Sequence, residues 1–186
     1  MSDILEIIRA LQRQKKRIIV ALDGRCAAGK TTLSAHLRYA IGCNVIPMDH
    51  FFLRPWQRTS ERLAEPGGNI DYERFLKEAL VPLIKGGDFS YCPFDCREMK
   101  LGKAISVKDN PINLVEGSYS CHPALFDYYD LRLFLTVAPK DQLKRIRERG
   151  GQGCLVDYVE KWIPLEERYF SAFDIQRRCD YSLTAP

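Results

Sequence analysis

The chain has 186 residues, of which 46% are hydrophobic and 28% charged, and its 28 Lys and Arg against 24 Asp and Glu give a net charge of +4. These values are ordinary for a globular protein and fit a single domain over residues 1–186. No apolar run reaches the roughly 18 residues that a membrane span needs, and the acidic N-terminus has the wrong charge order for a secretory signal. We therefore expect a cytoplasmic protein without a membrane partner.

The charge pattern and the cysteines exclude two further classes of protein. Acidic residues interleave with Lys and Arg almost throughout, so the chain lacks the basic stripe that is typical of nucleic-acid-binding proteins. A local anionic ligand explains the small basic excess equally well. The seven cysteines are an odd number, which indicates free thiols in a reducing compartment. Cys92 and Cys96 are four residues apart and lack a second pair, so no zinc site is predicted.

Apolar residues recur with helical spacing in some segments and form short continuous runs in others. In chain order we expect an N-terminal helix within 1–16, a strand over 18–22, a helix over 31–41, a strand over 45–48, a helix over 71–84, a hairpin within 88–108, strands over 112–115 and 133–137, helices over 140–149 and 155–177, and a strand over 181–183. Short apolar strands that alternate with helices predict an α/β fold with a mostly parallel sheet between helices on both faces.

Residues 24–31 read Gly-Arg-Cys-Ala-Ala-Gly-Lys-Thr and match the phosphate-loop pattern G-x-x-x-x-G-K-[ST]. The motif directly follows a predicted strand and opens a predicted helix, the context that its chemistry requires. The loop N–H groups and the helix N-terminus would bind phosphate oxygens, Lys30 would reach the β- and γ-phosphates, and Thr31 would help to hold Mg²⁺. The predicted nucleotide-binding residues are Gly24, Arg25, Cys26, Ala27, Ala28, Gly29, Lys30, Thr31 and Thr32.

Two acids follow predicted strands that should end at the same edge of the sheet as this loop. Asp49 follows the second strand, where a carboxylate can accept a proton from an attacking hydroxyl or bind Mg²⁺. Glu116 ends the strand over 112–115, where it can bind the Mg²⁺ water shell or a substrate hydroxyl. The alternative for Asp49 is a helix cap or a surface acid. Capping also suffices for Asp71, and the basic run over 140–149 is either a solvated helix face or a lid over the phosphates.

Taken together, these motifs resemble the uridine kinase / phosphoribulokinase / pantothenate kinase family of P-loop kinases. The matching segments occur in the family's order within residues 17–185, and they are residues 24–32, 48–52, 68–71, 115–117 and 145–149. The resemblance implies a P-loop NTPase three-layer sandwich with a small lid, here within 140–154, and a substrate hairpin. It implies Asp49 as general base, Glu116 near Mg²⁺, Asp71 on ribose hydroxyls, and Arg145 and Arg149 over the phosphates.

Two positions depart from the uridine kinase pattern. Phe52 stands where those enzymes carry Tyr, and Met99 stands about where their base-reading His would be. Phe52 and Phe94 can stack on a ring, but neither they nor Met99 offers a strong hydrogen bond. The residues expected for phosphotransfer are therefore present, whereas those expected to recognise a pyrimidine base are not.

The sequence therefore predicts an ATP- and Mg²⁺-dependent kinase that phosphorylates a hydroxyl of a small metabolite. The favoured acceptor is a nucleoside such as uridine or cytidine. Pantothenate, a nicotinamide riboside-like compound and a sugar are alternative acceptors. A nucleotide-binding regulatory protein without phosphotransfer is the alternative from another class, and a homo-oligomer is left open.

Overall fold

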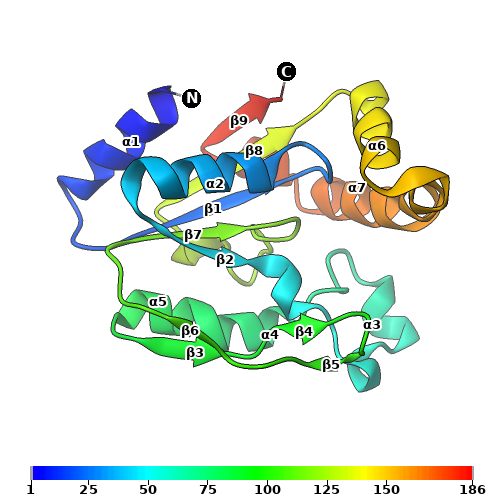
Figure 1. The fold of residues 1–186 in the computed structure, drawn as a ribbon, viewed down its shortest axis with the longest axis horizontal. Coiled ribbons are helices and arrows are strands. Elements are labelled where there is room, and N and C mark those ends of the chain that lie inside the picture. Colours follow the sequence, from blue (N-terminus) through cyan, green and yellow to red (C-terminus); the bar gives the residue numbers. More distant parts are fainter. Residues whose placement is uncertain (1, 186) are drawn as a thin grey trace.

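A five-stranded sheet forms the centre of the protein in a computed structural model that describes residues 2–185, and helices pack on both of its faces (Figure 1). All neighbouring strands are parallel and follow the order β2-β7-β1-β8-β9. The strands are β1 (Ile18–Gly24), β2 (Asn44–Pro47), β7 (Ile112–Glu116), β8 (Leu131–Thr136) and β9 (Tyr181–Thr184). The predicted α/β class is thus confirmed.

The central strand β1 is buried along its whole length because both of its faces are covered. Ile18, Val20 and Leu22 belong to one core cluster, together with apolar residues of α1 (Ser2–Gln12) and α2 (Lys30–Ile41). The alternate residues Ile19 and Ala21 belong to the opposite cluster. A continuous apolar run in a strand is what this two-sided burial requires.

The second face of the sheet is covered by the helix predicted over 71–84 and by helices near the C-terminus. The first is a continuous run of α4 (Tyr72–Phe75), the π-helical η3 (Leu76–Leu80) and α5 (Val81–Lys85). It begins where the Asp71 carboxylate accepts a 3.1 Å hydrogen bond from the Arg74 N–H, and it ends at Gly86, whose φ of 81° no L-residue adopts easily. The C-terminal helices are α7 (Ile163–Ala172) and α8 (Ile175–Arg178).

Smaller elements form a subregion below the sheet (Figure 1). The predicted hairpin consists of two short antiparallel ladders, β3 (Phe89–Tyr91) with β6 (Ile105–Val107) and β4 (Phe94–Asp95) with β5 (Lys100–Leu101). The remaining short helices are η1 (Met48–Phe51), η2 (Pro55–Gln57), α3 (Ser60–Ala64) and η4 (Phe126–Tyr128).

The helix boundaries after residue 138 differ from those predicted. α6 (Pro139–Asp157) runs past residue 149, is interrupted at Gly151 (φ 74°, ψ −173°), and continues through the π-helical η5 (Tyr158–Trp162) into α7. The helix predicted over 155–177 then ends at Ala172, because Asp174 adopts a left-handed conformation (φ 49°) before α8 begins. Likewise β8 begins two residues earlier than predicted, at Leu131.

The parallel arrangement brings three strand ends to one edge of the sheet. β1 leads into the loop of residues 24–29, β2 leads directly into η1 with Asp49, and β7 ends at Glu116, which is level with Leu22 of β1 and Pro47 of β2. Helices α6 and α7 cross this edge at the right of Figure 1. Within the described residues, no helix has the length and apolar character needed to cross a membrane.

Candidate active site

The loop of residues 24–29 curls at the carboxyl end of β1 because three of its residues adopt positive φ. Gly24 has φ 131°, and a Cβ added there would lie 2.0 Å from the Leu135 carbonyl oxygen, so only glycine fits. Ala27 (φ 57°) and Gly29 (φ 96°) complete the turn, and α2 starts at Lys30. The free N–H groups of the α2 N-terminus therefore face the loop, which is the geometry of an anion site.

Lys30 folds back over this loop instead of pointing to solvent. Its Nζ donates to the carbonyl oxygens of Gly24 (2.7 Å) and Arg25 (2.9 Å) and to Ser118 Oγ (3.2 Å). The side chain is buried, so its charge acts where water screens it little. An ammonium group held in this way can exchange its neutral partners for phosphate oxygens without moving far.

Asp49 and Glu116 are brought together at the edge of the sheet. Asp49 is exposed at the cavity wall, where the surrounding protein partly desolvates its carboxylate and raises its pKa above the usual range, against the opposing effect of the Lys30, His50 and Arg149 charges. The pKa of Glu116 is also raised, chiefly by burial and further by the negative charge of Asp49, while Lys30 opposes the shift. Pro47 rather than Asp49 is the N-cap residue of η1, so capping does not explain this carboxylate. Both groups are thus suited to accept a proton.

The same corner of the site offers oxygen ligands for a divalent cation. Thr31 Oγ1 lies 3.3 Å from Glu116 Oε1, and the Asp49 carboxylate is close enough to affect the pKa of Glu116. No group of three or more His, Cys, Asp and Glu side chains within residues 2–185 is arranged as a metal site. One or two carboxylates with a hydroxyl fit Mg²⁺, which takes its remaining ligands from water and substrate phosphates.

A cavity of about 810 Å³ extends from the phosphate loop past Asp49 towards the smaller elements below the sheet. Cys26, Ala27 and Gly29 line it, while Gly24 and Arg25 lie outside its lining. Burial, followed by the negative charge of Glu166, raises the pKa of Cys26 to about 12, so its thiol stays neutral. The other predicted site residues on the cavity wall are Lys30, Thr31, Thr32, Asp49, Phe52, Glu116, Arg145 and Arg149.

A second, mostly apolar crevice of about 520 Å³ adjoins the loop. It shares Gly29, Thr32 and Arg145 with the larger cavity, and Ala28 also contributes to its wall. Its apolar side chains come from the helices α1 and α2 and from the sheet edge beneath them, and they are Ile4, Leu33, Leu135, Leu183 and Ala185. A flat apolar group joined to a phosphate in the loop would fit here.

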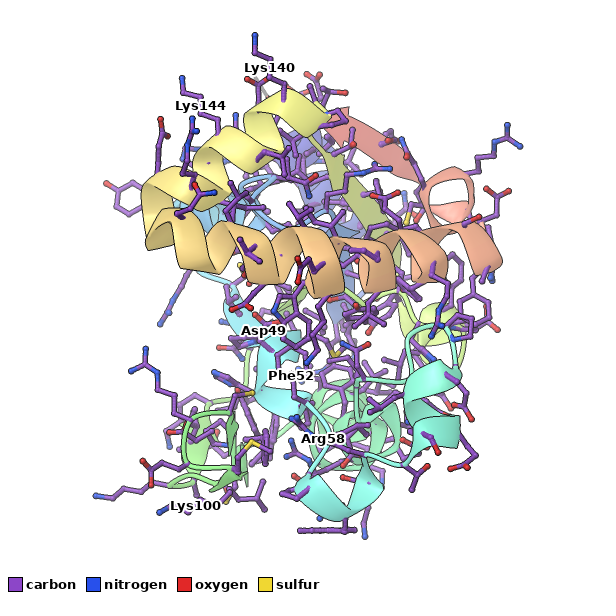
Figure 2. All side chains as sticks on the ribbon, turned by 90° about the vertical axis from the view of Figure 1, so that its right-hand side faces the viewer. Asp49, Phe52, Arg58, Lys100, Lys140 and Lys144 are labelled. Carbon is purple, nitrogen blue, oxygen red and sulfur yellow. The ribbon has the colours of Figure 1, made fainter. Side chains whose placement is uncertain are left out.

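The basic run on α6 divides between the two alternatives that the sequence left open. Lys140 and Lys144 are exposed and point away from the rest of the protein (Figure 2), which is the solvated face. Arg145 instead lies 3.3 Å from the Ala27 carbonyl oxygen in the phosphate loop. Arg149 contacts the Tyr158 hydroxyl at 3.0 Å, and its charge lowers the pKa of Asp49. Only the two predicted arginines thus face the cavity.

Asp71 and Phe94, the other two residues predicted to contact an acceptor, do not line the cavity. The buried Asp71 caps α4 and lies 3.4 Å from an Arg54 nitrogen and 3.6 Å from an Arg74 nitrogen. Phe94 is buried beneath the guanidinium of Arg58, with 5.7 Å from the guanidinium carbon to the ring centroid. The predicted contacts of Asp71 and Phe94 with an acceptor therefore gain no support from their placement.

Sequence patterns did not point to Glu166 on α7, yet it contacts the phosphate loop directly. Its buried carboxylate accepts hydrogen bonds from the Cys26 N–H (2.9 Å) and from the Ser118 hydroxyl (2.6 Å). Ser118 is also a partner of Lys30, so Glu166 joins the loop, the lysine and α7 in one network. No local motif marks this acid, because its partners lie far away in the sequence.

Asp23, the residue before the loop, is a second buried acid that pattern analysis missed. Its carboxylate accepts from the N–H groups of Gly24 (2.6 Å), Tyr119 (3.1 Å) and Cys121 (2.8 Å) and from the Tyr169 hydroxyl (2.9 Å). Burial raises its pKa to about 6, although these hydrogen bonds and Lys30 oppose the shift. Asp23 thereby fixes the segment after β7 that carries Ser118.

We expect Glu166→Gln to lower the free energy of unfolding by about 1–2 kcal/mol, because glutamine has one acceptor oxygen for two donors. In a domain of this size the melting temperature should fall by a few degrees. Glu167→Gln is the matched control, because Glu167 pairs with Arg25 at 2.6 Å in a partly exposed ion pair. Equal shifts in thermal denaturation of the two variants would contradict the role given to Glu166.

No protein-family model matches the chain. Solved structures with a similar fold are known, and they inform the fold rather than the reaction. The structure is similar to a possible uridine kinase from Bacillus stearothermophilus, with a TM-score of 0.68, 16% sequence identity, and coverage of 90% of this chain and 88% of that chain. It is also similar to TT1252 from Thermus thermophilus, with a TM-score of 0.50, 17% identity, and coverage of 92% and 90%. At these identities the similarity establishes the arrangement of sheet and helices alone.

Proposed function

We propose that the protein is an ATP- and Mg²⁺-dependent kinase that transfers the γ-phosphoryl group to a hydroxyl of a small metabolite. The observation that carries this proposal is the convergence, on one cavity, of a phosphate loop with the buried Lys30, the buried Glu116 carboxylate and the exposed Asp49 carboxylate. A nucleotide switch needs the loop, but it does not need a carboxylate base that faces a cavity large enough for a second substrate.

The donor nucleotide would occupy both cavities. Its base would lie in the apolar crevice beside α2, and its phosphates would reach the loop N–H groups and the N-terminus of α2. Lys30, Arg145 and Arg149 would stabilise the negative charge that develops on the transferred group, with the 140–154 segment acting as a lid. Thr31 and Glu116, with Asp49, would hold Mg²⁺, which neutralises phosphate charge when bound.

Asp49 would accept the proton of the acceptor hydroxyl, since its raised pKa makes it a better base than an ordinary aspartate. The acceptor would enter from the side of Phe52 and the 88–108 hairpin. A nucleoside is the acceptor that the sequence resemblance favours and the one that the name of the Bacillus stearothermophilus protein suggests. A ring could pack there against Phe52 or Trp162, whose own rings contact each other with centroids 6.4 Å apart.

The test is ADP formation from Mg·ATP with a panel of hydroxyl compounds that includes nucleosides, sugars, pantothenate and phosphorylated or carboxylated alcohols. We expect at least one acceptor to raise ADP formation by more than tenfold over the rate in water. Tight Mg·ATP binding without stimulation by any member of such a panel would instead favour a nucleotide-binding regulatory protein.

A further inference from the structure

The side of the cavity away from the phosphate loop carries positive charge that the protein leaves uncompensated. Arg58 lines this side, and its guanidinium is held by a 3.0 Å hydrogen bond from Nε to the Leu53 carbonyl oxygen and by the Phe94 ring beneath it. No acidic side chain within the described residues forms a salt bridge with it. In Figure 2, Asp49, Phe52 and Arg58 follow one another down this side, below the helix of η5 and α7.

The neighbouring arginines make Arg58 distinctive. Arg54 and Arg74 both lie within salt-bridge distance of Asp71, and Arg62 pairs with Glu73 at 2.8 Å. Each of these guanidiniums thus has a carboxylate partner within the same subregion. Arg58 has instead a backbone anchor, an aromatic support and a hydrogen bond with the Cys96 thiol, which orient its guanidinium without neutralising its charge.

A second cation reaches the cavity from the opposite wall. Lys161 of η5 lines the cavity with its Nζ 4.6 Å from the centroid of the Trp162 ring, and no described carboxylate forms a salt bridge with it. The acids of the cavity, Asp49, Glu116 and Glu166, are already assigned to the base, the cation site and the phosphate loop. Two cations next to aromatic rings therefore line the acceptor space, one from the turn after η2 and one from η5.

We propose that the phosphate acceptor carries, besides its hydroxyl, an anionic group, either a carboxylate or a phosphate, which Arg58 binds with the help of Lys161. This inference rests on the proposed kinase function and specifies its substrate class. The Arg58 and Lys161 side chains are exposed to the solvent of the cavity, and a neutral ribose diol would form an ion pair with neither of them. The resemblance to uridine kinases assigns Asp71 as the carboxylate that binds ribose hydroxyls. In this structure that carboxylate is enclosed by Arg54, Arg74 and the N-terminus of α4, so a ribose diol would lack this partner. An oriented guanidinium suits either anion, since both offer two oxygens to its planar donors.

Equilibrium binding can test the anion site without knowledge of the natural acceptor. The phosphate loop is first filled with Mg²⁺ and a non-hydrolysable ATP analogue, so that added anions cannot bind there. Trp56→Phe leaves Trp162 as the only tryptophan of a chain that has two, and its fluorescence then reports on the acceptor side. Inorganic phosphate and acetate are titrated separately, with sodium chloride at matched ionic strength as the reference.

We expect a saturable response to at least one of the two anions, and the stronger response identifies the phosphate or the carboxylate class. Arg58→Gln should weaken that binding at least tenfold, because one charge-assisted contact is lost, whereas Arg58→Lys should restore part of it. Lys144→Gln removes the same charge from the exposed face of α6 and should leave anion binding unchanged.

Two results would overturn the inference. One is the absence of a saturable anion response in the wild-type complex, and the other is equal affinity in wild type and Arg58→Gln. If Arg58→Gln does not fold, as judged by its melting curve, Lys161→Gln replaces it, with an expected weakening of at least threefold. Binding of the nucleotide analogue is measured before any anion is added, so its failure would count against the kinase proposal and not against the anion site.

Discussion

Lys30→Ala should lower kcat by about 10³-fold, which corresponds to roughly 4 kcal/mol of lost transition-state stabilisation. The reason lies in the position of Nζ, which is within hydrogen-bonding distance of three oxygens of the phosphate loop and its surroundings and is screened little by water. Steady-state ADP release with saturating acceptor and ATP measures the effect.

The variant should also lose some stability, since the carbonyl groups of Gly24 and Arg25 lose their buried donor. A cost of about 1–3 kcal/mol is expected, so the assay must run well below the melting temperature of the variant. Lys144→Ala, on the exposed face of α6, is the matched control and should keep full activity. Turnover of Lys30→Ala within tenfold of wild type would show that this lysine does not act on the phosphates.

The parts of the site that follow from local chain geometry were predictable from the sequence. The phosphate loop depends on glycines at fixed offsets between a strand and a helix, and a pattern of eight residues contains that information. Asp49 and Glu116 follow because parallel strands bring their carboxyl ends to one edge, whatever their order in the sheet. The structure places both acids on one cavity with Lys30.

The parts that depend on contacts between distant segments were not predictable. Glu166 reaches Cys26 across 140 positions of sequence, and no spacing rule connects an acid on α7 to a loop after β1. Asp71 occurs in a motif that resembles a ribose site, but Arg54 and Arg74 determine that its carboxylate is enclosed. The helix break at Asp174 was not predictable either, because the apolar residues around it keep helical spacing while Asp174 itself adopts a left-handed conformation.

Asp49→Asn is the variant that separates a kinase from a nucleotide-binding regulator. Asparagine keeps the size of the side chain and removes the proton acceptor, so kcat should fall by about 10²-fold or more. Affinity for ATP without Mg²⁺ should change little or improve slightly, because a negative charge near the γ-phosphate is removed. Calorimetric titration of ATP and a parallel turnover assay give the two quantities on the same protein.

The pH dependence of turnover gives an independent check on the same carboxylate. Desolvation at the cavity wall raises the pKa of Asp49, so its protonated and inactive form persists to a higher pH than for an aspartate in water. The wild-type rate should therefore fall with decreasing pH through a midpoint above the ordinary aspartate pKa. Asp49→Asn should lose this acid limb, whereas a role for Glu116 as the base would preserve it. If the asparagine variant kept both full turnover and the acid limb, Glu116 would be the remaining acid at the sheet edge, and Glu116→Gln would then have to abolish the limb.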